Sequence, residues 1–205
     1  MLHKVSLGVC AIERYRDLCP QELLDEVTSL GQELKGLRLC HINSTPFGGG
    51  VAELLVSFIP MMRGLGINAD WQVIRGDKRF FTITKGLHNA LQGAPFDDIE
   101  KASTRRTYLA NNMTNARELD TKYDVFIIND PQPAALRHYL PDKNNAKWIW
   151  RCHVDSSQPD AKVWEFLRPY VESHDAAVFT MEKFIPKDLN VAWITTMAPA
   201  ICAFT

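Results

Sequence analysis

The chain has 205 residues and a formal net charge of −1, with 46% hydrophobic and 23% charged residues. This composition indicates a globular protein of one or two domains, and without a basic surplus nucleic acid is not an expected partner. No apolar run reaches the roughly 20 residues that cross a bilayer. Because Glu13 and Arg14 closely follow the first apolar patch, we expect no signal peptide and a cytoplasmic protein with no membrane partner.

The first predicted element is a helix over residues 21–35, where apolar residues recur at helical spacing. The residues of this stripe are Leu23, Leu24, Val27, Leu30 and Leu34. Gly36 is expected to end the helix. We therefore expect residues 1–36 to form a leading segment with one helix, followed by a Rossmann-like domain over residues 37–205.

Short apolar runs and helical patterns alternate along the rest of the chain. Strands are predicted at 37–42, 69–74, 123–130, 146–153, 175–181 and 190–195. Helices are predicted at 51–65, with a kink at Pro60, and at 80–93, 98–119, 133–139 and 160–173. This alternation predicts an α/β fold of three layers, with a mostly parallel sheet between helices.

Cysteines and tryptophans are expected to be structural. The five cysteines are Cys10, Cys19, Cys40, Cys152 and Cys202. They form no CxxC pair, so we expect reduced thiols, no disulfide framework and no metal site. The five tryptophans are Trp71, Trp148, Trp150, Trp164 and Trp193, and we expect them in the core.

Three consecutive glycines separate the strand at 37–42 from the next helix. Gly48, Gly49 and Gly50 lack a Cβ, so the backbone can approach a ligand, and the helix that follows offers free N–H groups. Such a turn favours an anion, typically a phosphate. The spacing fits neither GxGxxG nor the Walker A motif, and the end of the second strand, Ile74-Arg75, lacks the acidic residue of a nicotinamide site. A tight turn without a ligand is the alternative.

A strand also precedes His153, so that His153 is expected at the carboxyl edge of the sheet, where ligands bind in this fold class. Arg151 and Asp155 flank it, and Asp130 and Gln132 follow a neighbouring strand. A histidine that serves the core, and a helix cap at Asp130, remain the alternatives.

Several stretches resemble one family of retaining GT-B glycosyltransferases, which contains trehalose synthase and trehalose phosphorylase. They are ERYRDLCPQELLDEV (13–27), HINSTPFGGGVAELL (41–55), FFTITKGLHNALQG (80–93), NDPQPAAL (129–136), WRCHVDSSQPDAKVWEFLRPYV (150–171) and VFTMEKFIP (178–186). The family pattern reads His-Asp-Pro-Gln-Pro where this chain has Asn129 at the first position.

The resemblance implies that the chain is one half of a GT-B fold, the N-terminal acceptor-binding domain, with the C-terminal donor-binding domain absent from these residues. The implied reaction transfers glucose from a nucleoside-diphosphate glucose to glucose and yields trehalose. The implied partners are an acceptor sugar, the nucleotide-sugar donor and a C-terminal domain in cis or in trans, and a homodimer is compatible with the family. No cofactor is implied, and the chain alone is expected to be inactive. Trehalose phosphorylase and a non-catalytic sugar-binding remnant are the alternatives.

The resemblance also assigns site residues. It implies that His153 is the catalytic group, hydrogen-bonded to the donor sugar, and that Gly48, Gly49 and Gly50 contact the donor phosphate or sugar. The residues implied around the acceptor are Asn43, Glu53, His88, Asn89, Asp130, Gln132, Arg151 and Asp155.

Overall fold

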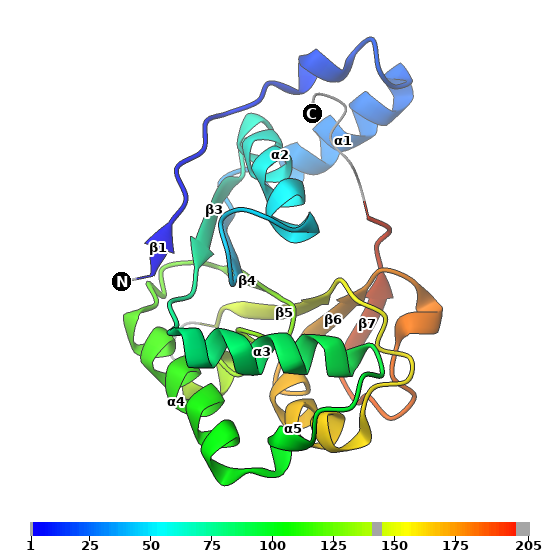
Figure 1. Cartoon of the computed structure of the whole chain (residues 1–205). Helices are drawn as coiled ribbons and strands as arrows, with labels where there is room; N and C mark the ends of the chain where they lie inside the picture. The colour runs from blue at the N-terminus through cyan, green and yellow to red at the C-terminus, as the bar shows by residue number, and fades with distance from the viewer. Residues whose placement is uncertain (1, 141–144, 200–205) are drawn as a thin grey trace.

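The computed structural model describes residues 2–140 and 145–199, which form a seven-stranded sheet in the order β1-β3-β2-β4-β5-β6-β7 (Figure 1). The strands are β1 His3–Lys4, β2 Arg38–Asn43, β3 Asn68–Val73, β4 Val125–Asn129, β5 Lys147–Cys152, β6 Ala176–Phe179 and β7 Trp193–Thr196. All neighbouring strands pair in parallel except β1, which is antiparallel to β3. The predicted α/β class with a mostly parallel sheet is confirmed.

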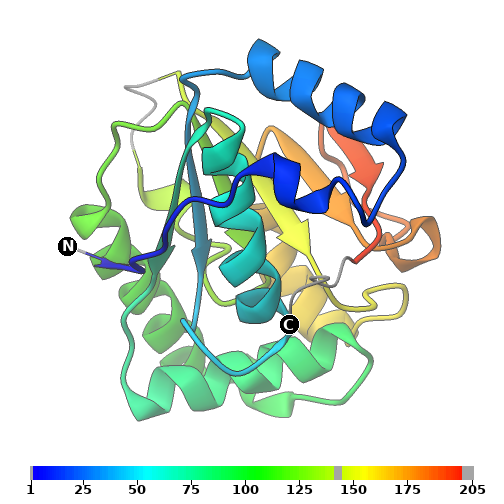
Figure 2. The same ribbon diagram turned by 90° about the horizontal axis from the view of Figure 1, so that it is seen from above.

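Helices cover both faces of the sheet. They are α1 Gln21–Glu33, α2 Gly50–Gly64, α3 Lys78–Leu91, α4 Ala102–Glu118 and α5 Ala161–Val171. Short 3₁₀ helices, η1 Ile12–Tyr15, η2 Asp97–Glu100, η3 Arg137–Tyr139 and η4 Glu182–Phe184, lie in the connections. Figures 1 and 2 show α1 and α2 on one side of the sheet and α3, α4 and α5 on the other, so the molecule has three layers.

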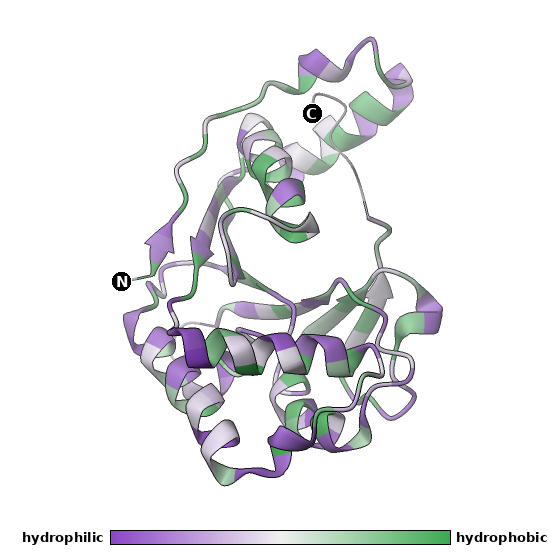
Figure 3. Ribbon diagram, viewed as in Figure 1, coloured by the Kyte–Doolittle hydropathy of each residue, from purple (hydrophilic) through white to green (hydrophobic). Residues whose placement is uncertain are grey.

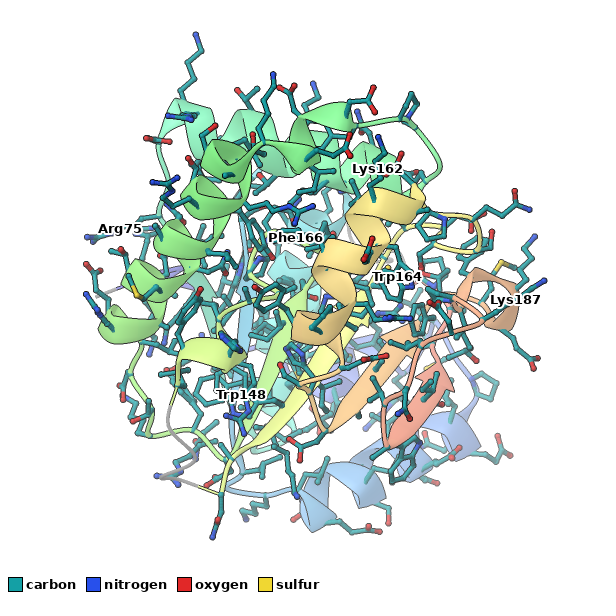
Figure 4. All side chains as sticks on the ribbon, turned by 90° about the horizontal axis from the view of Figure 1, so that it is seen from below. Arg75, Trp148, Lys162, Trp164, Phe166 and Lys187 are labelled. Atoms are coloured by element: carbon teal, nitrogen blue, oxygen red, sulfur yellow. The ribbon has the colours of Figure 1, made fainter. Side chains whose placement is uncertain are left out.

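Two hydrophobic clusters hold these layers together. The larger cluster fills the space between the sheet and α3, α4 and α5, and the smaller one lies between α2 and strands β2 and β3. In the larger cluster Phe166 of α5 points toward α4 (Figure 4), and its ring meets that of Tyr108 edge-on at 5.6 Å between centroids. α4 is otherwise hydrophilic along most of its length (Figure 3), and the residues that it buries are Thr104, Tyr108, Asn112, Asn115 and Ala116.

The structure adds one strand to the prediction and changes two predicted helices. His3–Lys4 forms an edge strand that the sequence analysis did not anticipate, within the segment assigned to 1–36. The helix predicted at 98–119 is divided into η2 and α4, because Lys101 has extended backbone angles. Residues predicted as a helix at 133–139 form turns and then η3, because the main-chain bonds from Leu136 to Pro133 and from Tyr139 to Leu136 span three residues, as in a 3₁₀ helix. By contrast, α2 continues through Pro60.

Two groups of apolar residues are more exposed than the sequence suggests. On α1, Leu24 and Gly31 are buried, whereas the leucines at 23, 30 and 34 are 45–51% exposed, because this helix is packed on a narrow face around Gly31 and Leu65. Four tryptophans lie in the core as predicted, but Trp193 is 70% exposed. Trp193 lies on the edge strand β7 and alternates with Ile194, which packs toward the larger cluster.

The cysteines that the structure describes are free thiols. Cys40 and Cys152 are buried, while Cys10 and Cys19 are partly exposed; Cys202 lies outside the described residues. Burial raises the pKa of the Cys152 thiol to about 12. Within the described part of the chain, no helix is long and apolar enough to cross a membrane.

Candidate functional site

The candidate site lies where the carboxyl ends of β2, β4 and β5 meet. β2 has β3 on one side and β4 on the other, so the chain order reverses at the β2–β4 pair. A crevice forms at such a switch point because the loops leave the two strands in opposite directions. The register pairs Asn129 with Arg151 and Ile42 with Ile128, which brings the predicted residues after each strand to this one edge.

The glycine turn after β2 is open to solvent. Gly48 and Gly49 have φ angles of 68° and 120°, a backbone region that suits glycine. A Cβ at Gly48, Gly49 or Gly50 would meet no atom of the described residues within 4 Å. No side chain in this part of the chain caps the amino terminus of α2, which begins at Gly50. The first-turn N–H groups can therefore serve an anion, as the sequence predicts.

Asn43 holds the start of this loop in place. It is 3% exposed, its amide nitrogen donates to the Thr45 carbonyl at 2.8 Å, and its oxygen accepts from Trp71 Nε1 at 2.8 Å. These contacts give Asn43 a structural role under the loop, whereas the sequence analysis assigned it to the acceptor. Trp71 was predicted only as a core residue, and its hydrogen bond to Asn43 has no signal in the sequence.

His153 lies directly after β5 and is half-buried at the switch point. Its Nε2 is 3.0 Å from Asn129 Oδ1, and Asn129 Nδ2 donates to the Ile42 carbonyl at 3.0 Å. One asparagine side chain therefore spans from the end of β2, where the glycine loop begins, to the His153 ring. Burial and the positive charge of Arg151 lower the pKa of His153 to about 4, so its ring is neutral at pH 7.

Asp130 fixes the backbone of His153. Its Oδ1 accepts from the His153 N–H at 2.9 Å, and its own N–H donates to the Arg151 carbonyl at 2.9 Å. Asp130 is 7% exposed and has a φ of 64°, which aspartate tolerates better than most side chains. Burial raises the pKa of Asp130, against the His153 hydrogen bond and the charges of His88 and Arg151.

The loop after Asp130 is anchored by α4, which the sequence analysis did not place at the site. Tyr108 OH donates to the Pro131 carbonyl at 2.7 Å, and Asn112 Nδ2 donates to the Gln132 carbonyl at 3.1 Å. Tyr108 is fully buried and Asn112 is 1% exposed. Their i, i+4 spacing on a helix is the only sequence signal, and it indicates a shared face without naming its partner.

Arg151 is a buried residue whose side chain links two segments of the fold. It is 3% exposed, and its Nη2 donates to the Met197 carbonyl at 2.6 Å, which ties β5 to the segment after β7. Its Nε and Nη1 have no partner among the described residues, and burial lowers the pKa of the guanidinium. Arg151 was predicted to contact the acceptor; its nitrogens are instead sealed within the fold, where its charge acts on His153 and Asp130.

His41, which was not predicted as a site residue, lies two positions before Asn43. It is 4% exposed, both ring nitrogens lack a hydrogen-bond partner among the described residues, and its ring meets Phe58 edge-on at 6.1 Å. Burial and the nearby His153 lower the pKa of His41 to about 3. The alternative considered for His153 was a histidine that serves the core. In the structure, His41 is such a histidine.

The other predicted residues are distributed unevenly around the edge. His88 on α3 is half-buried and close enough to Asp130 to influence its pKa, while Asn89 beside it is exposed. Glu53 is exposed in the first turn of α2. Gln132 is half-buried, and only its main chain is held. Asp155 is exposed and accepts from the Ser157 N–H at 2.9 Å, a local turn that lowers its pKa.

The arrangement combines two chemistries within one edge. The glycine turn presents backbone donors that suit an anion. His153 and Asp130 present side chains that suit hydroxyl groups, and they are held rigidly by Asn129 and by α4. In the described residues, no group of three or more His, Cys, Asp and Glu side chains could hold a metal ion.

Comparisons with known proteins show which family the chain resembles. Residues 41–186 match the family described as the N-terminal domain of trehalose synthase. The chain is 41% identical over 191 residues to a trehalose synthase of Thermococcus litoralis, which covers 93% of this chain and 46% of that protein. It is 25% identical over 210 residues to a trehalose phosphorylase of Pleurotus pulmonarius, covering 92% of this chain and 28% of that protein.

A solved structure shares the fold. The crystal structure of an α,α-trehalose-phosphate synthase (UDP-forming) from Burkholderia vietnamiensis superposes with a TM-score of 0.51 at 13% identity, over 78% of this chain and 47% of that one. The chain thus spans about half the length of the curated synthases that it matches.

Proposed function

The chain belongs to the family of trehalose synthase N-terminal domains, and we propose that it is the acceptor-binding half of a retaining GT-B glycosyltransferase. In this proposal, glucose passes from a nucleoside-diphosphate glucose to a second glucose, and trehalose is the product. A C-terminal domain, in cis or in trans, supplies most of the nucleotide site. The observation that carries the proposal is the meeting of an uncapped glycine turn with a rigidly held neutral histidine at one sheet edge.

Each half of that edge has a part in the proposed reaction. Negative charge develops on the departing diphosphate, and backbone N–H groups of the turn at Gly48–Gly50 are suited to stabilise it. His153 is suited to orient a hydroxyl group of the donor sugar, and Asp130 a hydroxyl group of the acceptor, which lowers the barrier by fixing the acceptor against the anomeric carbon. Glu53, being negative and beside the turn, would repel a phosphate and is better suited to a hydroxyl.

Binding by the isolated chain tests the proposed division of labour. Isothermal titration with glucose, trehalose and nucleoside diphosphates should give weak sugar binding and much weaker nucleotide binding. His153→Gln should weaken sugar binding roughly 10-fold, as expected for one lost hydrogen bond. His138→Gln, at an exposed histidine of η3, is the matched control and should bind like the parent. Tight nucleotide binding without sugar binding would count against the proposal.

Turnover tests the need for a second domain. The 205-residue chain should not transfer glucose by itself, and addition of the C-terminal half of the Thermococcus litoralis relative should restore transfer. Turnover by the chain alone at the rate of that full-length relative would refute the proposal. No turnover in either arm, together with sugar binding, would favour a non-catalytic sugar-binding role.

Trehalose phosphorylase is the second candidate, because the chain also matches the Pleurotus pulmonarius enzyme over 92% of its residues. In that reaction inorganic phosphate takes up glucose from trehalose. The same reconstituted sample should be supplied with trehalose and phosphate, and glucose 1-phosphate should be measured. Its release in preference to trehalose formation would favour the phosphorylase.

A further inference from the structure

Asn129 has its side-chain amide oriented by two fixed carbonyl groups. Its Nδ2 lies 3.0 Å from the Ile42 carbonyl and 3.3 Å from the Ile127 carbonyl. Both groups can only accept, so the nitrogen must face them and the oxygen must face the other way. Asn129 is 1% exposed, and the reversed amide would place three oxygens in contact without a proton between them. The two carbonyl groups therefore determine which way the Asn129 amide is oriented.

The oxygen of Asn129 then determines the proton position on His153. Oδ1 lies 3.0 Å from His153 Nε2, and an amide oxygen can only accept a hydrogen bond. Nε2 must therefore carry the proton. In a neutral imidazole the other nitrogen, Nδ1, is then an acceptor. Among the described residues no group forms a hydrogen bond with Nδ1. Nδ1 is also not one of the fully buried polar atoms that lack a partner.

We propose that Asn129 is a positioning residue that holds His153 in its Nε2–H form, so that Nδ1 presents a lone pair to a ligand hydroxyl. Asp130 complements it by binding the His153 backbone N–H at 2.9 Å. Two consecutive residues at the end of β4 thus fix the ring and the main chain of one residue at the end of β5. This inference rests on the proposed function for its ligand, but the tautomer itself does not depend on it.

The charged and titratable groups around His153 do not provide another proton donor or acceptor for Nδ1. Arg151 on the same strand directs its Nη2 to Met197, and its positive charge opposes protonation of the ring. His153 lowers the pKa of His41 on β2 through space, and neither ring nitrogen of His41 has a hydrogen-bond partner among the described residues. Oδ1 of Asp130 already accepts from the His153 backbone N–H. His88 on α3 acts on the pKa of Asp130.

The tautomer has a consequence for ligand choice. A lone pair on Nδ1 accepts a hydrogen bond from a hydroxyl group, but it repels a deprotonated phosphate oxygen, which is also an acceptor. The opposite tautomer would favour the phosphate. His153 is therefore specific for a hydroxyl donor such as a sugar, and the anion is left to the glycine turn.

The test is nitrogen NMR of the full chain labelled with ¹⁵N-histidine, at pH 7.5 and without ligand. The His153 signal is assigned by its loss in His153→Gln. We expect Nε2 in the position of a protonated ring nitrogen and Nδ1 in that of a bare one. The reverse pattern, or an even mixture of the two tautomers, would overturn the inference and leave the proposed function standing.

Two variants separate Asn129 from the rest of the site. Asn129→Leu removes the acceptor and should allow the tautomers to mix. Asn129→Asp keeps an oxygen for Nε2–H but sets its other oxygen against the Ile42 and Ile127 carbonyls. In the folded variant the tautomer should persist, and the negative charge should raise the pKa of His153. Asn68→Leu, at an exposed asparagine that bonds the Gly36 carbonyl, should change nothing. An unchanged tautomer in a folded Asn129→Leu would contradict the proposal; if that variant does not fold, the parent and Asn129→Asp spectra decide.

Ligand addition then tests the acceptor. Glucose or trehalose should move the Nδ1 signal toward that of a hydrogen-bonded nitrogen, and inorganic phosphate should not. A shift with phosphate and none with sugar would overturn the stated preference for hydroxyl donors. The expected tautomer with no response to either ligand would support the role of Asn129 and count against the proposed function.

Discussion

The loop after β2 and the loop after β4 leave the same edge of the sheet, but they are held in opposite ways. In the first, Phe47 is 76% exposed and the three glycines have open space around them. In the second, Asp130 is 7% exposed and the carbonyls of Pro131 and Gln132 accept bonds from α4. A site can thus pair an adaptable stretch of main chain with rigid side chains. The following predictions test that contrast.

The largest expected effect is at the anchor of the rigid loop. Tyr108→Ala should lower the free energy of unfolding by about 3–5 kcal/mol, because it empties a fully buried aromatic site. Tyr108→Phe keeps the ring but leaves the Pro131 carbonyl only the longer bond, 3.4 Å, from the Ala134 N–H, at a cost of about 0.5–1.5 kcal/mol. Urea denaturation followed by circular dichroism measures both. Equal stability of Tyr108→Phe and the parent would mean that the hydroxyl does not anchor this loop.

Acid should destabilise the folded chain through histidines that burial keeps neutral. Burial lowers the pKa values of three histidines, to about 3 for His41 on β2, about 4 for His153 after β5, and about 4 for His174, a buried residue between α5 and β6. Their ordinary pKa is about 6.5, so as pH falls from 6.5 toward 4 the unfolded chain takes up protons that the folded chain does not. Each contributes stability above pH 6.5 and loses at most about 1.4 kcal/mol per unit below it.

Urea midpoints at pH 7.5, 6.0 and 5.0 measure this loss. The raised pKa of Asp130 opposes the trend in part, since a carboxyl that binds its proton more readily when folded gains stability in acid. A midpoint that stays constant across these three values would contradict the neutral, buried state of the histidines.

The open loop should respond to backbone geometry alone. Gly49 has φ 120° and ψ 152°, a region that is nearly restricted to glycine, so Gly49→Ala should cost about 1–3 kcal/mol of stability. Gly50→Ala meets no atom and has no positive φ, so its effect should stay within about 0.5 kcal/mol. Thermal unfolding of the pair provides the comparison. Equal losses would indicate that the turn is packed after all.

The smallest expected effect is a gain. His41→Leu removes two ring nitrogens that lack partners and should raise the free energy of unfolding at pH 7.5 by about 1 kcal/mol. The same variant should lessen the acid sensitivity described above. Urea denaturation at pH 7.5 and 5.0 tests both expectations, and a large loss of stability at pH 7.5 would show that His41 has a polar partner.

Much of the fold follows from local patterns. The strand at 123–130 is a continuous apolar run, and it lies in the middle of the sheet. The turn at Gly48–Gly50 was predicted from residue type, because the positive φ angles of Gly48 and Gly49 suit glycine. The exposed Trp193 could not be predicted, since an edge position depends on strand order, which no local pattern contains.

The interior of the site was less predictable. Arg151, Asn43 and Asp155 were expected around the acceptor because the family resemblance implies it. The structure uses them for a strand connection, a loop support and a local turn. Tyr108 and Asn112 were missed, because their partners are main-chain carbonyls more than 19 residues away along the chain. Every residue has a main-chain carbonyl, so the sequence does not indicate which carbonyl a side chain will bind.

The uneven burial of the tryptophans makes the molecule suitable for optical measurement. Trp71, Trp148, Trp150 and Trp164 are at most 5% exposed, whereas Trp193 is 70% exposed. A dissolved quencher such as iodide must touch an indole ring to extinguish its emission, so the quenched fluorescence should come almost entirely from Trp193. Any molecule that settles on β7 at that residue would shield the emission from iodide, and its arrival could be timed in a stopped-flow instrument without attaching a dye.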